Sequence, residues 1–267
     1  MHGQMTLETR SVGQIGHEDV EPRTFARPST VRTPSPSIFL RRLEVINNLS
    51  EPERALVGRL SVFRETIQAG RPFWRQGQPV AARVIISGWA CRQRTLPDGR
   101  RQIFGLLLPG DTVGLNVTAT PLDQMATVAI NRVESMDALM LREILTLGDV
   151  RYARLKAAID ETRRLEDVYL LNHVMRLGRQ SALERLAHLI LEIQERTRLA
   201  GLLQAGRFPM PLTQEVLSDA LGLSIVHVNR TMQQLKRDRL IEVKSGQVAV
   251  LDQRRLETIA DYGSHDE

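Results

Sequence analysis

The segment 212–251 constrains the fold more than any other part of this chain, because it combines signals for two short helices, a sharp turn and two strands. Thr213 is a residue type that caps helices, and apolar residues then recur on one helix face over 214–220. Gly222 follows this helix and permits the positive φ of a sharp turn. The apolar Leu223 can fill the angle between two helices, so the segment predicts a helix-turn-helix.

A second helix is predicted over 225–236, with Ser224 as its cap. Its inward face is formed by residues at three- and four-residue spacing, namely Val228, Thr231, Met232 and Leu235. Its outward face carries a largely polar set, namely Ile225, Val226, Asn229, Arg230, Gln233 and Arg237. Since Arg, Asn and Gln side chains fit base edges and phosphates, this face is a candidate for contact with the major groove of DNA.

Two strands are predicted after this helix, over 240–243 and 247–251, around the turn signal Lys244-Ser245-Gly246. An ordinary helical hairpin would explain the two helices alone, but a β-hairpin at this distance is typical of the wing of a DNA-binding domain. The residues predicted to contact DNA come from the caps, the outward face and the wing: Thr213, Ser224, Ile225, Val226, His227, Asn229, Arg230, Gln233, Arg237 and Lys244. Two readings of His227 stay open, a phosphate contact and a purely local polar role.

This region resembles the DNA-binding domain of the Crp/Fnr family of bacterial transcription regulators. The resemblance continues upstream through 176–193, which is similar to the hinge and first helix of that domain, and through 88–115, which is similar to the family's β-roll sensor domain. It covers the chain from about 38 to 253. It implies an α+β fold, in which an N-terminal jelly-roll-like β-roll of the cyclic-nucleotide-binding kind is followed by a long dimerisation helix and a C-terminal winged helix-turn-helix. It also implies a homodimer that binds double-stranded DNA at a palindromic site and contacts RNA polymerase.

The start of the second helix departs from the family pattern, in which the capping Ser is often followed by Arg-Glu-x-x-x-Arg. Arg230 matches the last Arg of this pattern, which implies a bidentate contact with guanine or a contact with a phosphate. Ile225 and Val226 stand where Arg and Glu are common. A Val cannot accept a hydrogen bond from cytosine and favours a thymine methyl group. We therefore expect Val226 and His227 to shift the preferred half-site.

The rest of the chain divides into segments that differ in composition and in hydrophobic periodicity. A polar, Pro-containing extension at the start of the chain is predicted to be disordered. A helical lead-in follows it and precedes strands with Gly turns such as Pro97-Asp98-Gly99. Long helical patterns come after these strands. Closely spaced strands over 62–145 suggest the barrel. The predicted domains are the extension 1–37, the β-roll 38–148, the dimerisation helix and hinge 149–178, the DNA-binding domain 179–253 and a tail 254–267.

A heptad pattern runs along the helix predicted over 149–176. Residues at alternating three- and four-residue spacing form it, and they define a predicted dimer seam: Leu155, Ala158, Thr162, Leu165, Tyr169 and Asn172. The alternative, a single amphipathic helix lying on the core of its own chain, stays open. A second amphipathic helix, over 179–195, is expected to support the helix-turn-helix through Leu183, Leu186, Ala187, Ile190 and Leu191.

The signal that the β-roll senses is left open by the sequence. Family members that bind cyclic AMP hold it with a Gly-Glu pair and an Arg-Ser pair, but Leu115 replaces the Glu and Gln124-Met125 replace the Arg-Ser. Cyclic AMP binding of the usual kind is therefore not expected. Cys91 is the only cysteine, whereas an iron–sulfur cluster needs about four thiolates. Cys91 is a redox-sensing thiol, a haem ligand or a small buried apolar residue.

Composition sets broader limits on function. The formal net charge of +5 fits a nucleic-acid partner without demanding one. A single cysteine, the lack of a secretion signal pattern and the lack of an apolar run near the roughly 18 residues that span a bilayer predict a cytoplasmic protein. No His lies between residues 18 and 172, so a metal-dependent catalytic barrel is not expected, and no catalytic or metal-binding residue is assigned. The competing hypothesis is a small-molecule-binding or enzymatic barrel whose helix-turn-helix only packs.

Overall fold

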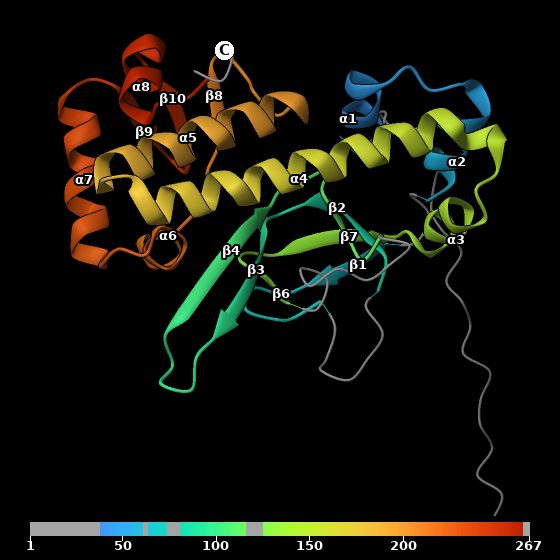
Figure 1. The fold of residues 1–267 in the computed structure, drawn as a ribbon, viewed down its shortest axis with the longest axis horizontal. Coiled ribbons are helices and arrows are strands. Elements are labelled where there is room, and N and C mark those ends of the chain that lie inside the picture. Colours follow the sequence, from blue (N-terminus) through green and yellow to red (C-terminus); the bar gives the residue numbers. More distant parts are fainter. Residues whose placement is uncertain (1–37, 61–63, 74–80, 116–124, 264–267) are drawn as a thin grey trace, which may run out of the picture. The chain divides into compact units, whose positions relative to one another are not determined.

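A computed structural model describes residues 38–60, 64–73, 81–115 and 125–263. The extension 1–37, which the sequence predicts to be disordered, lies outside the described residues. Two helices open the described chain, α1 (Ile38–Ile46) and α2 (Glu51–Leu60). The predicted helical lead-in is confirmed, and α2 begins after Ser50, whose backbone N and Oγ both donate to Glu53 at 2.7 Å. The lead-in is thus a pair of helices, shown in blue in Figure 1.

The strands that follow form two antiparallel sheets. Their bounds are β1 (Arg64–Ile67), β2 (Arg83–Ser87), β3 (Ala90–Thr95), β4 (Arg101–Leu107), β5 (Thr112–Val113), β6 (Ala126–Ala129) and β7 (Val133–Asp137). One sheet has the order β1-β7-β2-β5 and the other the order β4-β3-β6. Side chains of both sheets share one buried cluster, which includes Ile85, Ala90, Leu107 and Val133. This arrangement confirms the predicted β-roll.

The predicted turn between the third and fourth strands is also confirmed. Leu96 N donates to the carbonyl of Arg100 at 2.7 Å, and Gly99 has a φ of 86°. The end of the β-roll differs from the prediction, in which closely spaced strands continue to residue 145. Helix α3 (Leu139–Leu147) lies there and buries Leu141 and Leu145. Apolar residues at four-residue spacing carried the helical signal that the strand interpretation missed.

Two long helices connect the β-roll to the C-terminal region. After a 3₁₀ turn, η1 (Val150–Tyr152), α4 spans Ala153–Arg179 and α5 spans Ala182–Leu199. Helix α4 ends because Gln180 is extended, and Ser181 then caps α5 in a reciprocal box with Glu184. The two helices pack side by side (Figure 1). The supporting face predicted for α5 is confirmed, although Leu183 is only partly buried.

The C-terminal elements match the predicted winged helix-turn-helix and add two that the sequence analysis missed. Helices α6 (Gln214–Leu221) and α7 (Ile225–Arg237) precede the hairpin of β9 (Ile241–Lys244) and β10 (Gln247–Val250). A third strand, β8 (Arg207–Pro209), pairs with β10. The predicted tail at 254–267 is wrong over its first part, where α8 (Gln253–Ala260) buries Leu256 and Ala260 against α5.

None of the helices in the described ranges is long and apolar enough to cross a membrane.

Candidate nucleic-acid interface

The helix-turn-helix forms because each of its corners has the residue type that the backbone requires. Thr213 Oγ1 accepts from Val216 N and Ser224 Oγ accepts from His227 N, both at 3.2 Å, so both predicted caps are confirmed. Gly222 lies between the helices with a φ of 62°. A Cβ at this position would also come within 3.2 Å of Leu177 Cδ2, so a larger residue is disfavoured twice.

The inward face of α7 fixes the orientation of the whole helix. Val228, Thr231 and Leu235 are buried, and Met232 is half-buried against the same core. These are the four residues that the spacing predicted for this face. Because the face is held by core packing, the opposite face of α7 must point to solvent.

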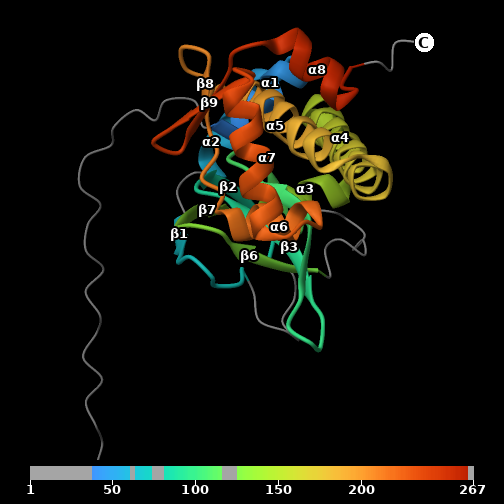
Figure 2. The ribbon, with the colours of Figure 1, turned by 90° about the vertical axis from the view of Figure 1, so that its left-hand side faces the viewer.

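The outward face of α7 is exposed as predicted. Val226 is 79% exposed and Ile225 is 48% exposed, so neither residue is held in the core. A shallow hollow on this face is lined by Gln214, Ile225, Val226, Asn229, Arg230, Gln233 and Arg237. Six of these residues were predicted from the sequence, and the seventh, Gln214, is the first residue of α6 and was missed. Figure 2 views the side of the molecule on which α6 and α7 lie.

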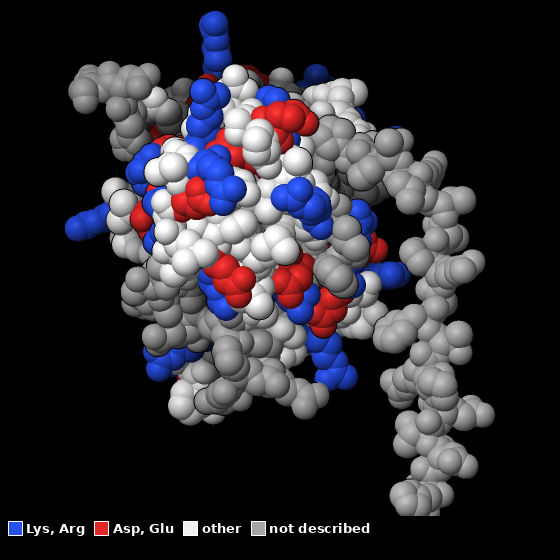
Figure 3. Space-filling model, turned by 90° about the vertical axis from the view of Figure 1, so that its right-hand side faces the viewer, with Lys and Arg blue, Asp and Glu red and all other residues white. Residues whose placement is uncertain are grey.

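The charge of α7 suits a polyanion. The helix has Arg230, Lys236 and Arg237 on exposed positions and has no acidic residue. The opposite side of the molecule, in Figure 3, has basic and acidic side chains interspersed. The positive character of the candidate interface therefore comes from the arrangement of charges along one helix, because the net charge of the last domain does not supply it.

His227 has a defined local role in this structure. Its Nε2 lies 3.1 Å from Nη2 of Arg230. Because a guanidinium can only donate, this contact requires Nε2 to be the acceptor, so the proton of a neutral ring is on Nδ1. The contact favours one of the two readings left open, a local polar role, and it holds Arg230 against its own helix.

The wing forms with a turn of two residues. Ser245 has a φ of 50° and Gly246 a φ of 73°, the left-handed pair that a two-residue hairpin needs. Lys244 is exposed at the end of β9. Thus all the residues predicted to contact DNA are exposed, except His227, which is half-buried.

Arg185 on α5 positions the helix-turn-helix, and the sequence analysis missed it. Its Nη1 donates to the carbonyl of Leu221 at 2.9 Å, at the end of α6. Its Nη2 donates to the carbonyl of Leu177 at 3.1 Å, and its Nε donates to that of Gln180 at 2.7 Å. One guanidinium thus ties α6 to the end of α4. Such a contact leaves no periodic signal in a sequence.

The predicted dimer seam is wrong for its N-terminal half. Leu155 and Ala158 are fully buried and Thr162 is 3% exposed, because this face of α4 packs on the core of its own β-roll. Tyr169 is covered by the Arg196 guanidinium, whose carbon lies 4.6 Å from the ring centroid. The other two seam residues, Leu165 and Asn172, are half-buried. The apolar residues that α4 leaves exposed lie on another face: Val168, Leu171, Val174 and Met175.

Where the structure describes the sensor residues singled out by sequence, they are buried or half-buried, and Cys91 belongs to the core that the β-roll shares with α5 and the helix-turn-helix. Cys91 is 2% exposed, and burial raises the pKa of its thiol to about 11. The thiol is therefore protonated at neutral pH, which favours the apolar interpretation over redox sensing. Leu115 is 4% exposed, Met125 is half-buried, and Gln124 lies outside the described residues.

Two family models match the chain. A Crp-like helix-turn-helix domain covers residues 184–259, and a cyclic nucleotide-binding domain covers residues 64–135. The first of these ranges includes all of α8 except its last residue, which agrees with the packing of that helix on the domain core.

Known proteins resemble the chain over most of its length. The nitrogen fixation regulation protein FixK of Bradyrhizobium diazoefficiens is 32% identical over 66% of this chain and 72% of its own length. The transcriptional activator protein FnrL of Cereibacter sphaeroides is 31% identical over 81% of this chain and 88% of its own. The solved structure of FixK2 from Bradyrhizobium japonicum is 26% identical, covers 73% of this chain and 96% of that one, and has a TM-score of 0.62.

Proposed function

Because the chain belongs to the Crp/Fnr family of transcription regulators, we propose that it binds a palindromic operator as a homodimer, with α7 of each protomer in the major groove of one half-site. The family consists of DNA-binding regulators, so the chain is a regulator and not an enzyme. The observation that carries the proposal is the exposed face of α7. It combines Asn229, Arg230 and Gln233 with a helix free of acidic residues.

The dimer is proposed to form through the apolar face that α4 leaves exposed, with a second copy of this chain as the occupant. Val168, Leu171 and Met175 follow one another at three- and four-residue spacing, as the seam of a coiled coil requires. They are 47%, 68% and 55% exposed. The stripe borders a groove of about 740 Å³ that Ile259 of α8 also lines. A paired α4 would allow the two α7 helices to reach half-sites about 34 Å apart.

The half-site is proposed to differ at one base pair from the half-site sequence that is common in the family. Arg230, in the second turn of α7, is proposed to donate to guanine or to a phosphate. Val226, one turn earlier, offers only an apolar surface and suits a thymine methyl group. Thr213, Ser224 and Lys244 are exposed around these residues and are proposed to contact the DNA backbone.

The proposal includes a contact with RNA polymerase. FnrL of Cereibacter sphaeroides is named a transcriptional activator, and an activator acts by helping the polymerase at a promoter. Since a bacterial regulator meets DNA and polymerase in the cytoplasm, we place the protein there.

The experiment that tests this function is a binding titration on a labelled fragment of the protein's own promoter region. Arg230→Ala should weaken specific binding by about tenfold to a hundredfold, because a bidentate contact with guanine contributes about 1–3 kcal/mol. Arg100→Ala, which removes an exposed arginine from the tip of the β3–β4 turn, should bind as the unaltered protein does. Equal loss in both variants, or no sequence-specific binding by the unaltered protein, would contradict the proposal.

A further inference from the structure

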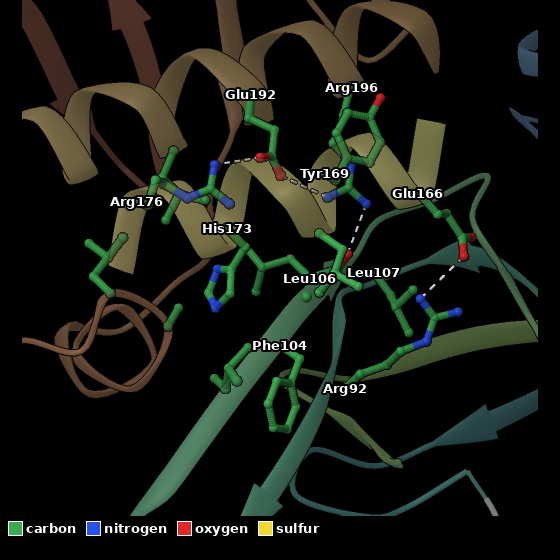
Figure 4. Close-up of a pocket in the computed structure, with 16 residues that line it drawn as sticks. Arg92, Phe104, Leu106, Leu107, Glu166, Tyr169, His173, Arg176, Glu192 and Arg196 are labelled. Carbon is green, nitrogen blue, oxygen red and sulfur yellow. Dashed lines mark hydrogen bonds and ion pairs between the residues drawn. The ribbon is translucent and has the colours of Figure 1, made fainter. Parts of the chain in front are cut away.

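A small cavity lies where β4, α4, α5 and the end of α6 meet, with a volume of about 40 Å³. Figure 4 shows its lining, in which charged and aromatic side chains come from β3, α4 and α5: Arg92, Glu166, Tyr169, Arg176, Glu192 and Arg196. The volume has room for about three water molecules. It is about a tenth of a typical metabolite pocket, so a nucleotide does not fit in it.

Positive charge exceeds negative charge in the buried cluster around this cavity. Four arginines, each at most 7% exposed, belong to the cluster: Arg42, Arg92, Arg176 and Arg196. Three carboxylates pair with them: Asp111, Glu166 and Glu192. Four cations against three anions leave an excess of one positive charge. Burial also raises the pKa of Glu166, which disfavours the charge that opposes Arg92. A buried charge without a partner is costly.

The same arginines have donors without acceptors. The Nε–H groups of all four are buried, and among the described residues none has a hydrogen-bond acceptor. The contacts of Arg92 are also long, with 3.3 Å from Nη1 to Glu166 Oε2 and 3.4 Å from Nη2 to the carbonyl of Thr112. Both exceed the range of about 2.7–3.2 Å for a good N–H···O bond. Arg92 thus lines the cavity with an unpaired Nε–H group and two long contacts.

We propose that this cavity binds one small monovalent anion, of the size of chloride, nitrate or formate, beside Arg92 and between β3 and the helices α4 and α5. One negative charge balances the cluster, and an anion can accept from guanidinium Nε–H groups that have no other acceptor. Neither the family models nor the names of the relatives assign such a site to this place.

Anion binding would also affect how the DNA-binding region is held. Arg196 extends from α5 to the β-roll, where its Nη2 donates to the carbonyl of Leu106 at 2.8 Å and to Asp111 Oδ2 at 2.6 Å. Arg92 approaches the same cavity from β3. An anion between them adds a contact that exists only while α5 lies against the sheet. Occupancy of the cavity therefore stabilises this docked arrangement.

The test is the thermal unfolding midpoint of the full chain at constant ionic strength. Sodium gluconate, whose anion is too large for the cavity, is replaced stepwise by sodium chloride, nitrate or formate. At least one small anion should raise the midpoint by about 5 °C in a saturable way, as expected for a ligand at about a hundred times its Kd. Comparison of the nitrate and formate titrations shows whether the cavity prefers an inorganic oxyanion or a carboxylate. Identical midpoints in all four salts would show that water fills the cavity and would overturn the proposal.

Three variants separate a bound anion from a general salt effect. Arg92→Gln should abolish the saturable rise, because it leaves the cluster neutral. Glu166→Gln should tighten binding of the same salt by about tenfold or more, because it removes an opposing charge near the site. Arg94→Gln, an exposed neighbour on β3, should respond as the unaltered protein does. If Arg92→Gln does not fold, Glu166→Gln decides, since weaker or unchanged binding in that variant contradicts the site.

Discussion

At the scale of single residues, Val226 sets this chain apart from the common pattern of its family. It is 79% exposed and lines the same hollow as Arg230. Val226→Glu should create an acceptor for the cytosine amino group and raise the preference for cytosine at that position by about tenfold or more. Affinities for four operators that differ at one base pair would measure this.

Leu147→Glu is the matched control, because it adds the same charge at an apolar residue that is 81% exposed on α3, outside the candidate interface. Its base preference should not change. An unchanged preference in Val226→Glu would show that this residue does not face a base.

Two buried histidines make stability depend on pH. Burial, with a further contribution from the nearby Arg176, lowers the pKa of both His173 and His188 to about 4. The unfolded chain takes up these protons near pH 6.5, whereas the folded chain does so only near pH 4. The free energy of unfolding should therefore fall as the pH drops from about 6.5 to about 4. Chemical denaturation across this range would measure the slope.

The His173→Gln variant lacks one of the two titrating groups. The fall in its free energy of unfolding between about pH 6.5 and about pH 4 should therefore be smaller by up to about 3 kcal/mol. A slope that stays the same in this variant would mean that the pKa of His173 does not differ between the folded and the unfolded chain.

At the scale of elements, α4 has two apolar faces, and only one of them is covered. The heptad pattern predicted a seam that includes Leu155 and Ala158, but that face packs on the core of its own chain. Hydrophobic periodicity indicates that a helix face is buried, but it does not indicate whether the same chain or a partner chain buries it. The exposed face with Leu171 is the one that we assign to the dimer.

Leu171→Asp should therefore yield monomers, because a charge on each of two facing helices opposes their pairing. Light scattering should show the mass fall from that of two 30.1 kDa chains to that of one. Operator affinity should fall by about a hundredfold or more, since the two half-sites no longer bind as one unit. Val150→Asp, at an 86% exposed residue before α4, is the control and should stay dimeric. If the Leu171→Asp variant stays dimeric, the proposal that this face forms the dimer interface is wrong.

Short elements with strong end signals were predictable, whereas contacts between distant elements were not. The caps Thr213 and Ser224 and the turn at Gly222 depend on local chemistry, so the sequence predicted α6 and α7 to within a residue of their observed ends. Local signals for α8 are also present in the sequence, since Asp252 caps the helix and Leu256 and Ala260 follow at one-turn spacing, and the predicted tail overlooks them.

At the scale of the whole molecule, buried charges connect segments that lie far apart in the sequence. Asp111 and Arg196 are separated by 85 positions, and Arg42 and Asp111 by 69. No local pattern marks such pairs, because an isolated Asp or Arg in a sequence is more often on the surface. The family and the fold could thus be read from motifs, while the charged cluster and the cavity beside it required the structure.

The central feature of the proposed function is that two α7 helices bind one DNA site together. The most direct test is selection of bound sequences from random double-stranded DNA by the unaltered protein. We expect an enriched inverted repeat whose half-sites lie about one helical turn apart, with thymine at the position that faces Val226. Enrichment of a single unpaired half-site, or no enrichment at all, would contradict it.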